Sequence, residues 1–140
     1  MTELIVIHGI SLPPGEYGGQ EIEALFTNTL DADAHPYFAE ISGLEVSAHF
    51  LVRRAGEVVQ FVSTDARAWH AGVSCWQGRE QCNDFSIGIE LEGCDDEAYS
   101  DAQYDALNQL LAALTKQYPD IRHDAIVGHS DIAPGRKTDP

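Results

Sequence analysis

The stretch from residue 85 to residue 119 constrains the fold most, because its hydrophobic pattern changes period half-way along. In residues 85–92 apolar residues alternate with others, which predicts a strand with one apolar face; its other face carries Ser86, Gly88, Glu90 and Glu92. Residues 100–103 (SDAQ) match a capping box, and Pro119 ends the helix that this box begins. The apolar stripe of the helix comprises Ala102, Leu107, Leu110, Leu111 and Leu114.

Shorter segments supply the rest of the predicted fold. Residues 4–8 form a continuous apolar run typical of a buried strand, and residues 20–29 have a helical apolar face. Residues 46–53 alternate in polarity, and residues 58–62 are predicted to pair back on them as a hairpin. A last short apolar segment ends at His129. This order predicts an α/β (α+β) fold: a central mixed β-sheet flanked by helices, in one domain of 140 residues.

The charge of the chain excludes some classes of partner. The formal net charge is −15, and only 8 residues are Lys or Arg, which argues against nucleic acid and against anionic membrane surfaces. No stretch approaches the roughly 20 apolar residues of a membrane span. The N-terminus lacks the basic region of a secretory signal, and the 3 cysteines fit no paired metal spacing. We therefore expect a cytoplasmic monomer with reduced thiols.

Residues 63–84 are predicted to be largely irregular. A long irregular stretch inside a compact domain is more often a functional loop than a simple connection. This one contains Trp69 and His70, which are candidates for a binding role in such a loop. For Trp69, packing in the core is an equally good interpretation.

Three residues far apart in the sequence are candidate zinc ligands. His8 ends the first apolar run, His129 follows the last one, and Asp139 lies in the loop after it. Imidazole and carboxylate groups bind Zn²⁺, and a catalytic zinc needs three protein ligands and one open position. Spacing alone leaves an equal alternative, in which His129 is a capped loop histidine and Asp139 a solvated residue.

Two further residues suit hydrolysis at such a metal. Glu90 lies on the polar face of its predicted strand, where a carboxylate can take the proton of a water molecule. Lys137 lies two residues before Asp139, where an ammonium group can stabilise a developing oxyanion. Taken singly, each is more often an ordinary exposed side chain, because most Glu and Lys residues are exposed.

The chain also resembles the zinc N-acetylmuramoyl-L-alanine amidases of the AmpD type. The resemblance runs in order through residues 5–19 (IVIHGISLPPGEYGG), 34–38 (AHPYF), 46–49 (VSAH), 67–74 (RAWHAGVS), 82–93 (CNDFSIGIELEG) and 136–140 (RKTDP). It implies a mixed sheet flanked by helices, shared with peptidoglycan recognition proteins. It also implies one Zn²⁺ per chain and a cytosolic role in peptidoglycan recycling. The implied reaction is hydrolysis of the amide between the lactyl group of N-acetylmuramic acid, 1,6-anhydro in form, and L-alanine of a muropeptide.

The resemblance assigns a role to each candidate. The zinc ligands of the family fall on His8, His129 and Asp139, its catalytic glutamate on Glu90 and its lysine on Lys137. We place Trp69 and His70 in the substrate groove. We expect His49 to support a metal ligand by a hydrogen bond from behind. Two alternatives remain open: a broader phage-type amidase, and a muropeptide-binding module without catalysis.

The chain departs from the family pattern at several points. Gly9 stands where the enterobacterial enzymes have asparagine, and Glu45 and Gln81 stand where those enzymes carry arginines that meet the stem peptide. We hypothesise a weaker preference for the peptide terminus, with Arg79 as a substitute contact. The segments that precede and follow this region in the family are absent from residues 1–140. We therefore expect a single zinc amidase domain without these extensions, in which Asp139 is poorly held.

Overall fold

A five-stranded mixed sheet forms the centre of the computed structural model, which describes residues 2–41 and 43–140. The strand order is β3-β2-β6-β1-β7. The strands are β1 (Leu4–Ile10), β2 (Phe50–Val52), β3 (Val58–Gln60), β6 (Ser86–Glu92) and β7 (Ile126–Gly128). All neighbouring pairs are parallel except β2 and β3, which form the predicted antiparallel hairpin at one edge. The mixed sheet confirms the predicted fold class.

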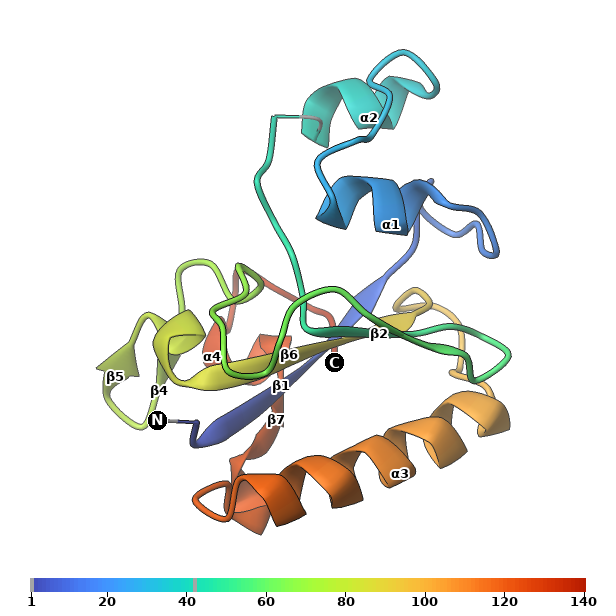
Figure 1. The fold of residues 1–140 in the computed structure, drawn as a ribbon. Coiled ribbons are helices and arrows are strands. Elements are labelled where there is room, and N and C mark those ends of the chain that lie inside the picture. Colours follow the sequence, from blue (N-terminus) through green and yellow to red (C-terminus); the bar gives the residue numbers. More distant parts are fainter. Residues whose placement is uncertain (1, 42) are drawn as a thin grey trace.

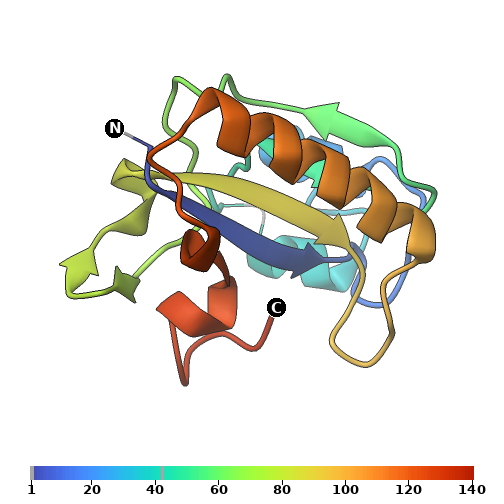
Figure 2. The ribbon, with the colours of Figure 1, turned by 90° about the horizontal axis from the view of Figure 1, so that it is seen from below.

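Helices cover the sheet from both sides (Figure 1). The long helix α3 (Asp101–Gln117) packs on one face, whereas α1 (Glu21–Phe26) and α2 (Pro36–Ile41) lie on the opposite side. Figure 2, seen from below, shows α3 lying over the sheet and running roughly lengthwise along β6 and β1. The short helix α4 (His129–Ile132) follows β7, and a small hairpin of β4 (Cys75–Trp76) and β5 (Arg79–Glu80) lies beside it. None of the helices in the described ranges is long and apolar enough to cross a membrane.

Two apolar clusters hold these layers together. The larger one joins α3 to the sheet and includes fully buried residues of the central strands, among them Ile5, Ile87 and Ile89. The smaller one lies under α1 and α2 and includes Ile22, Phe26 and Phe38. Strands buried on both faces are expected in a parallel sheet, because helices cover both of its faces. Accordingly every residue of β6 is buried, its polar face included.

The helix boundaries predicted from the capping box are correct. The Ser100 side chain accepts a hydrogen bond from the backbone N–H of Gln103, and the Gln103 side-chain oxygen accepts one from the backbone N–H of Ser100. The predicted stripe was wrong at Ala102, which is exposed. Gln103 is buried there instead, and its Nε2 donates to the carbonyl oxygens of Val52 and Glu92. A polar side chain with satisfied hydrogen bonds thus replaces the apolar contact expected from periodicity alone.

The segment 46–53 forms a shorter strand than predicted. Only Phe50–Val52 is strand, although residues 48–52 are all buried. Before β2 the backbone bonds to two different segments, because Ser47 N–H donates to Trp69 and His49 N–H donates to Gly88. Because Ser47 bonds to the loop at Trp69 and not to β6, regular strand pairing begins only at Phe50.

Candidate metal centre and active site

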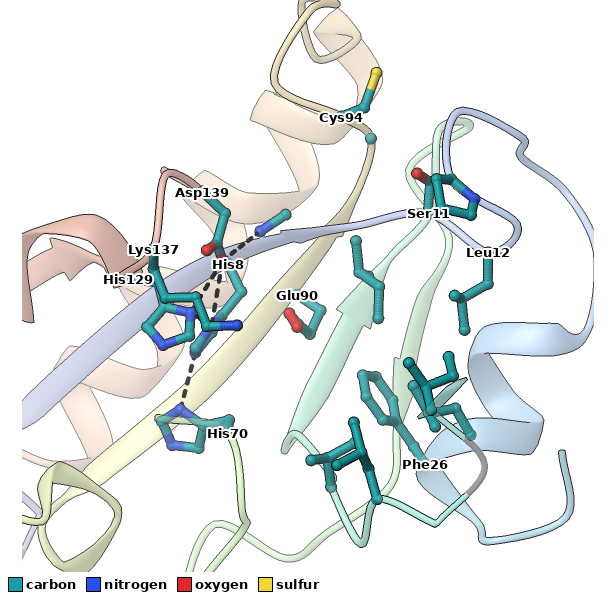
Figure 3. A pocket seen from close by; sticks show the side chains of 18 of the residues that line it. His8, Ser11, Leu12, Phe26, His70, Glu90, Cys94, His129, Lys137 and Asp139 are labelled. Carbon is teal, nitrogen blue, oxygen red and sulfur yellow. Dashed lines mark hydrogen bonds and ion pairs between the residues drawn. The ribbon is translucent and has the colours of Figure 1, made fainter. Parts of the chain in front are cut away.

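The sheet topology brings the three candidate metal ligands together. His8 on β1 is the register partner of Glu90 on β6, so both side chains point to the same face of adjacent parallel strands. β7 pairs with the other edge of β1 and delivers His129 immediately after its last residue. Asp139 returns beside them, and Figure 3 shows these side chains converging. Such a position, near the carboxyl ends of parallel strands, is where open α/β sheets bind ligands.

The three candidate ligand atoms form a small triangle. Nδ1 of His8 lies 2.9 Å from Nδ1 of His129, and Oδ2 of Asp139 lies 3.1 Å from His129 Nδ1 and 3.5 Å from His8 Nδ1. Ligands at zinc bond lengths of about 2.0–2.1 Å in a tetrahedral arrangement stand roughly 3.3 Å apart. The spacing of these atoms therefore fits a single Zn²⁺ ion.

The hydrogen bonds behind the two imidazoles explain why lone pairs face this triangle. His129 Nε2 lies 3.0 Å from the carbonyl oxygen of Ala71, which only accepts, so we assign the proton of His129 to Nε2. His8 Nε2 lies 2.9 Å from Nδ1 of His70, and His70 Nε2 lies 3.1 Å from the Ser86 hydroxyl. With a proton on each Nε2, both Nδ1 atoms and the carboxylate present lone pairs to one another. A cation satisfies all three.

The protonation states also suit metal binding. Burial lowers the pKa of His8 to about 4, so its imidazole is neutral near pH 7. Burial acts to raise the pKa of Asp139, but the adjacent His129 and His8 imidazoles outweigh it and hold that pKa below its ordinary value. Neutral imidazole and ionised carboxylate are the forms that bind zinc.

The pKa of His8 gives a test in the metal-free protein. Between pH 6.5 and about 4 the unfolded chain binds a proton at His8 that the folded chain excludes, so acidification destabilises the fold. This pKa shift corresponds to a loss of about 3 kcal/mol in unfolding free energy. The loss is absent near pH 7 and complete near pH 4. Urea unfolding of wild type and His8→Gln at both pH values measures it. Between pH 7 and pH 4, we expect the unfolding free energy of wild type to fall by about this amount more than that of His8→Gln. A difference that is constant with pH contradicts this.

Asp139 is well held, contrary to the expectation of a frayed position. Its backbone carbonyl accepts a hydrogen bond of 2.9 Å from Ser130 N–H, and its carboxylate accepts one of 3.3 Å from Gly9 N–H. The segment before it is fixed by a bond of 3.0 Å from Lys137 N–H to the Ala133 carbonyl and by contact of Thr138 with Asp95. Local hydrogen bonding thus places this carboxylate.

Glu90 is buried beside the triangle. It is 8% exposed, and its Oε2 has no hydrogen-bond partner among the described residues. Burial raises its pKa well above the ordinary value, and the nearby charge of Asp139 adds to this effect. A carboxylate with a free oxygen and a raised pKa is suited to accept a proton. Lys137 lines the same pocket, as does His129 (Figure 3).

The pocket has a volume of about 480 Å³ and two chemically different sides. The polar side carries the candidate catalytic and ligand residues. The other side is apolar and comes largely from α1, α2 and the loops next to them; it includes Leu12, Leu25, Phe26, Tyr37, Ile41, Leu44 and Val46. Trp69 lines the pocket and is 55% exposed, so it does not pack in the core. The Arg67 guanidinium lies 4.2 Å from the centre of the Trp69 ring and supports it.

Two predicted site residues lie elsewhere. His49 does not contact a candidate ligand: its Nε2 bonds to the Ala66 carbonyl and its Nδ1 accepts from Gly88 N–H, so it joins backbone segments. The supporting contact to His8 comes from His70 instead. Arg79 is not among the residues that line this pocket, because it pairs with Glu3 and stacks 3.8 Å from the Phe85 ring.

Comparison with known proteins decides the family. The model of the N-acetylmuramoyl-L-alanine amidase family (Amidase_2) matches residues 2–140. The chain belongs to the N-acetylmuramoyl-L-alanine amidase family. One relative of this amidase is the 1,6-anhydro-N-acetylmuramyl-L-alanine amidase AmpD of Escherichia coli K12, which is 65% identical over 137 residues, or 98% of this chain and 74% of AmpD.

Solved structures agree with this assignment. A crystal structure of an AmpD derivative superposes on this amidase with a TM-score of 0.97 at 62% identity, covering 99% of this chain and 77% of that one. AmpDh3 from Pseudomonas aeruginosa, solved in complex with anhydromuramic pentapeptide, matches with a TM-score of 0.76 at 31% identity. That match covers 99% of this amidase and 55% of AmpDh3. The resemblance stated from sequence motifs is therefore confirmed.

Proposed function

We propose that this amidase hydrolyses the amide between the lactyl group of 1,6-anhydro-N-acetylmuramic acid and L-alanine of the stem peptide, in peptidoglycan recycling. The observation that carries the proposal is the convergence of His8, His129, Asp139, Glu90 and Lys137 on one pocket. The names of its relatives supply the substrate class. We further propose that residues 1–140 act as one domain, as a monomer and in the cytoplasm.

Zinc is the metal that best suits the candidate ligands. His8 and His129 would each offer Nδ1 and Asp139 would offer Oδ2, which makes an open set of two imidazoles and one carboxylate. When bound, Zn²⁺ supplies Lewis acidity, which lowers the pKa of water and polarises a carbonyl group.

Glu90 and Lys137 have complementary roles in the proposed reaction. Glu90 takes a proton from the attacking water as the new carbon–oxygen bond forms. The same carboxyl group then gives this proton to the alanine nitrogen as the carbon–nitrogen bond breaks. The products are a lactyl carboxylic acid and an amine, which become carboxylate and ammonium when the second proton of the water passes to the amine. The ammonium group of Lys137 stabilises the negative charge that develops on the carbonyl oxygen.

The apolar side of the pocket supports a preference for the anhydro sugar. In the 1,6-anhydro form an oxygen bridge between C1 and C6 replaces two hydroxyl groups, so this edge of the sugar has no hydrogen-bond donor. The aliphatic and phenyl side chains on that side of the pocket, such as Leu12 and Phe26, offer no acceptor to a hydroxyl group; Tyr37 is the exception. Burying an unpaired hydroxyl costs about 1–3 kcal/mol. We therefore expect kcat/KM to be about tenfold or more higher for the anhydro form than for the reduced sugar.

Mass spectrometry of a mixture of both sugar forms of muramyl-tripeptide tests the proposal. Zinc-loaded protein should release free tripeptide, mostly from the anhydro form, and a chelator should stop the release. Absence of cleavage of either form would contradict the proposed activity and favour a binding-only module. Equal rates on the two forms would leave the amidase reaction standing and refute the sugar preference.

A further inference from the structure

One dipeptide, His70–Ala71, contacts both imidazoles of the candidate metal centre from behind. The His70 ring lies 2.9 Å from His8 Nε2, and the Ala71 carbonyl oxygen lies 3.0 Å from His129 Nε2. These contacts fix the orientation of two rings that come from β1 and from the start of α4. The position of this dipeptide therefore decides whether the two Nδ1 atoms face each other.

A single side chain holds the dipeptide in place. Oδ1 of Asn83 accepts hydrogen bonds from the backbone N–H groups of His70, at 3.1 Å, and Ala71, at 2.9 Å. Asn83 is only 7% exposed and lies in the single 3₁₀ turn Cys82–Asp84 that leads into β6. The preceding residue, Gln81, adopts a left-handed conformation with φ of 55°, which shows how tightly the chain turns there.

Other contacts close the remaining sides of the dipeptide. The His70 ring lies against Gly88 of β6 so closely that a Cβ atom at position 88 would collide with it. The Arg136 guanidinium donates a hydrogen bond of 2.8 Å to the Ala71 carbonyl, the same oxygen that faces His129. Asn83 supplies the only side-chain acceptor recorded for the two N–H groups within the described ranges. Loss of the Asn83 side chain would leave both N–H groups without this acceptor and would loosen the dipeptide.

We propose that Asn83 is a positioning residue of the metal centre: through His70–Ala71 it orients both His8 and His129 toward the metal. The proposal rests on the proposed function, because it assumes that these imidazoles bind Zn²⁺. An outer partner that orients a ligand typically changes metal affinity 10–100-fold when it is removed. Here one side chain serves two ligands, so we expect the upper part of that range.

Three variants separate positioning from general stability. N83A removes the acceptor, and N83D keeps an oxygen that can accept from both N–H groups. Q103A is the matched control, because Gln103 is also a buried amide with two hydrogen bonds to backbone groups, but it lies between α3 and the ends of β2 and β6. We expect the zinc Kd, measured by competition with a chelator, to weaken about 30–100-fold in N83A. We expect a change of less than about threefold in N83D and Q103A. Should N83A fail to fold, N83S gives the same comparison with a shorter acceptor and an expected weakening of about tenfold or more.

Nitrogen NMR of the histidine rings in metal-free protein provides a second readout. In wild type, N83D and Q103A, His8 and His129 should both carry their proton on Nε2, whereas N83A should lose this defined tautomer at both rings. A zinc Kd in N83A no weaker than in Q103A, with unchanged tautomers, would overturn the proposal. If wild type binds no zinc, the proposed function fails, but the NMR comparison still decides whether Asn83 orients the two rings.

Discussion

Replacing His8 with alanine is expected to abolish hydrolysis and to weaken zinc binding by well over the roughly 10–100-fold that loss of an outer partner causes. The reason is that His8 supplies one of three candidate ligand atoms, and its ring is also the buried group that His70 and Asp139 contact. A chelator competition gives the zinc Kd, and mass spectrometry of the anhydro substrate gives the activity.

His123→Ala is the matched control for this variant. It also removes one histidine, but His123 is exposed in the turn before β7, away from the pocket. We expect wild-type zinc affinity and activity in this control. Wild-type zinc affinity in His8→Ala would show that the metal is bound elsewhere.

Replacing Glu90 with glutamine is expected to lower kcat by about 10²–10⁴-fold while zinc stays bound. Glutamine has nearly the same shape as glutamate but cannot take the proton of water. Because burial raises the pKa of Glu90, its ionised form is costly in the fold, so the neutral amide should also make the metal-free protein more resistant to urea near pH 7. A lower rate together with equal or higher stability separates a catalytic role from a structural one.

Glu80→Gln controls for the change of charge, because Glu80 is exposed on β5. It should leave kcat unchanged. A Glu90→Gln variant that retains activity within about fivefold would refute the role of Glu90 as the proton acceptor, since general acid–base groups contribute far more than this.

The parts of the fold that local sequence determines were predicted correctly. The capping box at Ser100 and the apolar run before His8 each encode their own element, so α3 and β1 lie where they were expected. The segment 46–53 was harder, because its backbone pairs with Trp69 and Gly88, and such distant partners leave no periodic pattern in the segment itself. The prediction that Ala102 is buried failed for a related reason. Gln103 occupies the buried position on that turn, and its hydrogen bonds are made to residues of the strands.

The candidate site was predictable to the extent that side-chain chemistry defines it. The residue types of His8, His129 and Asp139 indicated a metal, and the family motifs selected them from alternatives of equal weight. The contacts behind the ligands were not predictable in this way. The Ala71 carbonyl is a backbone group that any residue would supply, and Asn83 acts on backbone N–H groups of a loop that the sequence only showed to be irregular. His49 was given a supporting role because it lies on the polar side of its predicted strand, and only the structure shows that the ring that reaches His8 is His70.

X-ray absorption at the zinc edge of the zinc-loaded protein reports directly which atoms bind the metal. We expect one tightly bound zinc per chain with only nitrogen and oxygen ligands at about 2.0–2.2 Å, including two imidazoles. A sulfur ligand at about 2.3 Å would place the metal at a cysteine and contradict the assignment to His8, His129 and Asp139. Failure of the folded protein to retain zinc would contradict it as well.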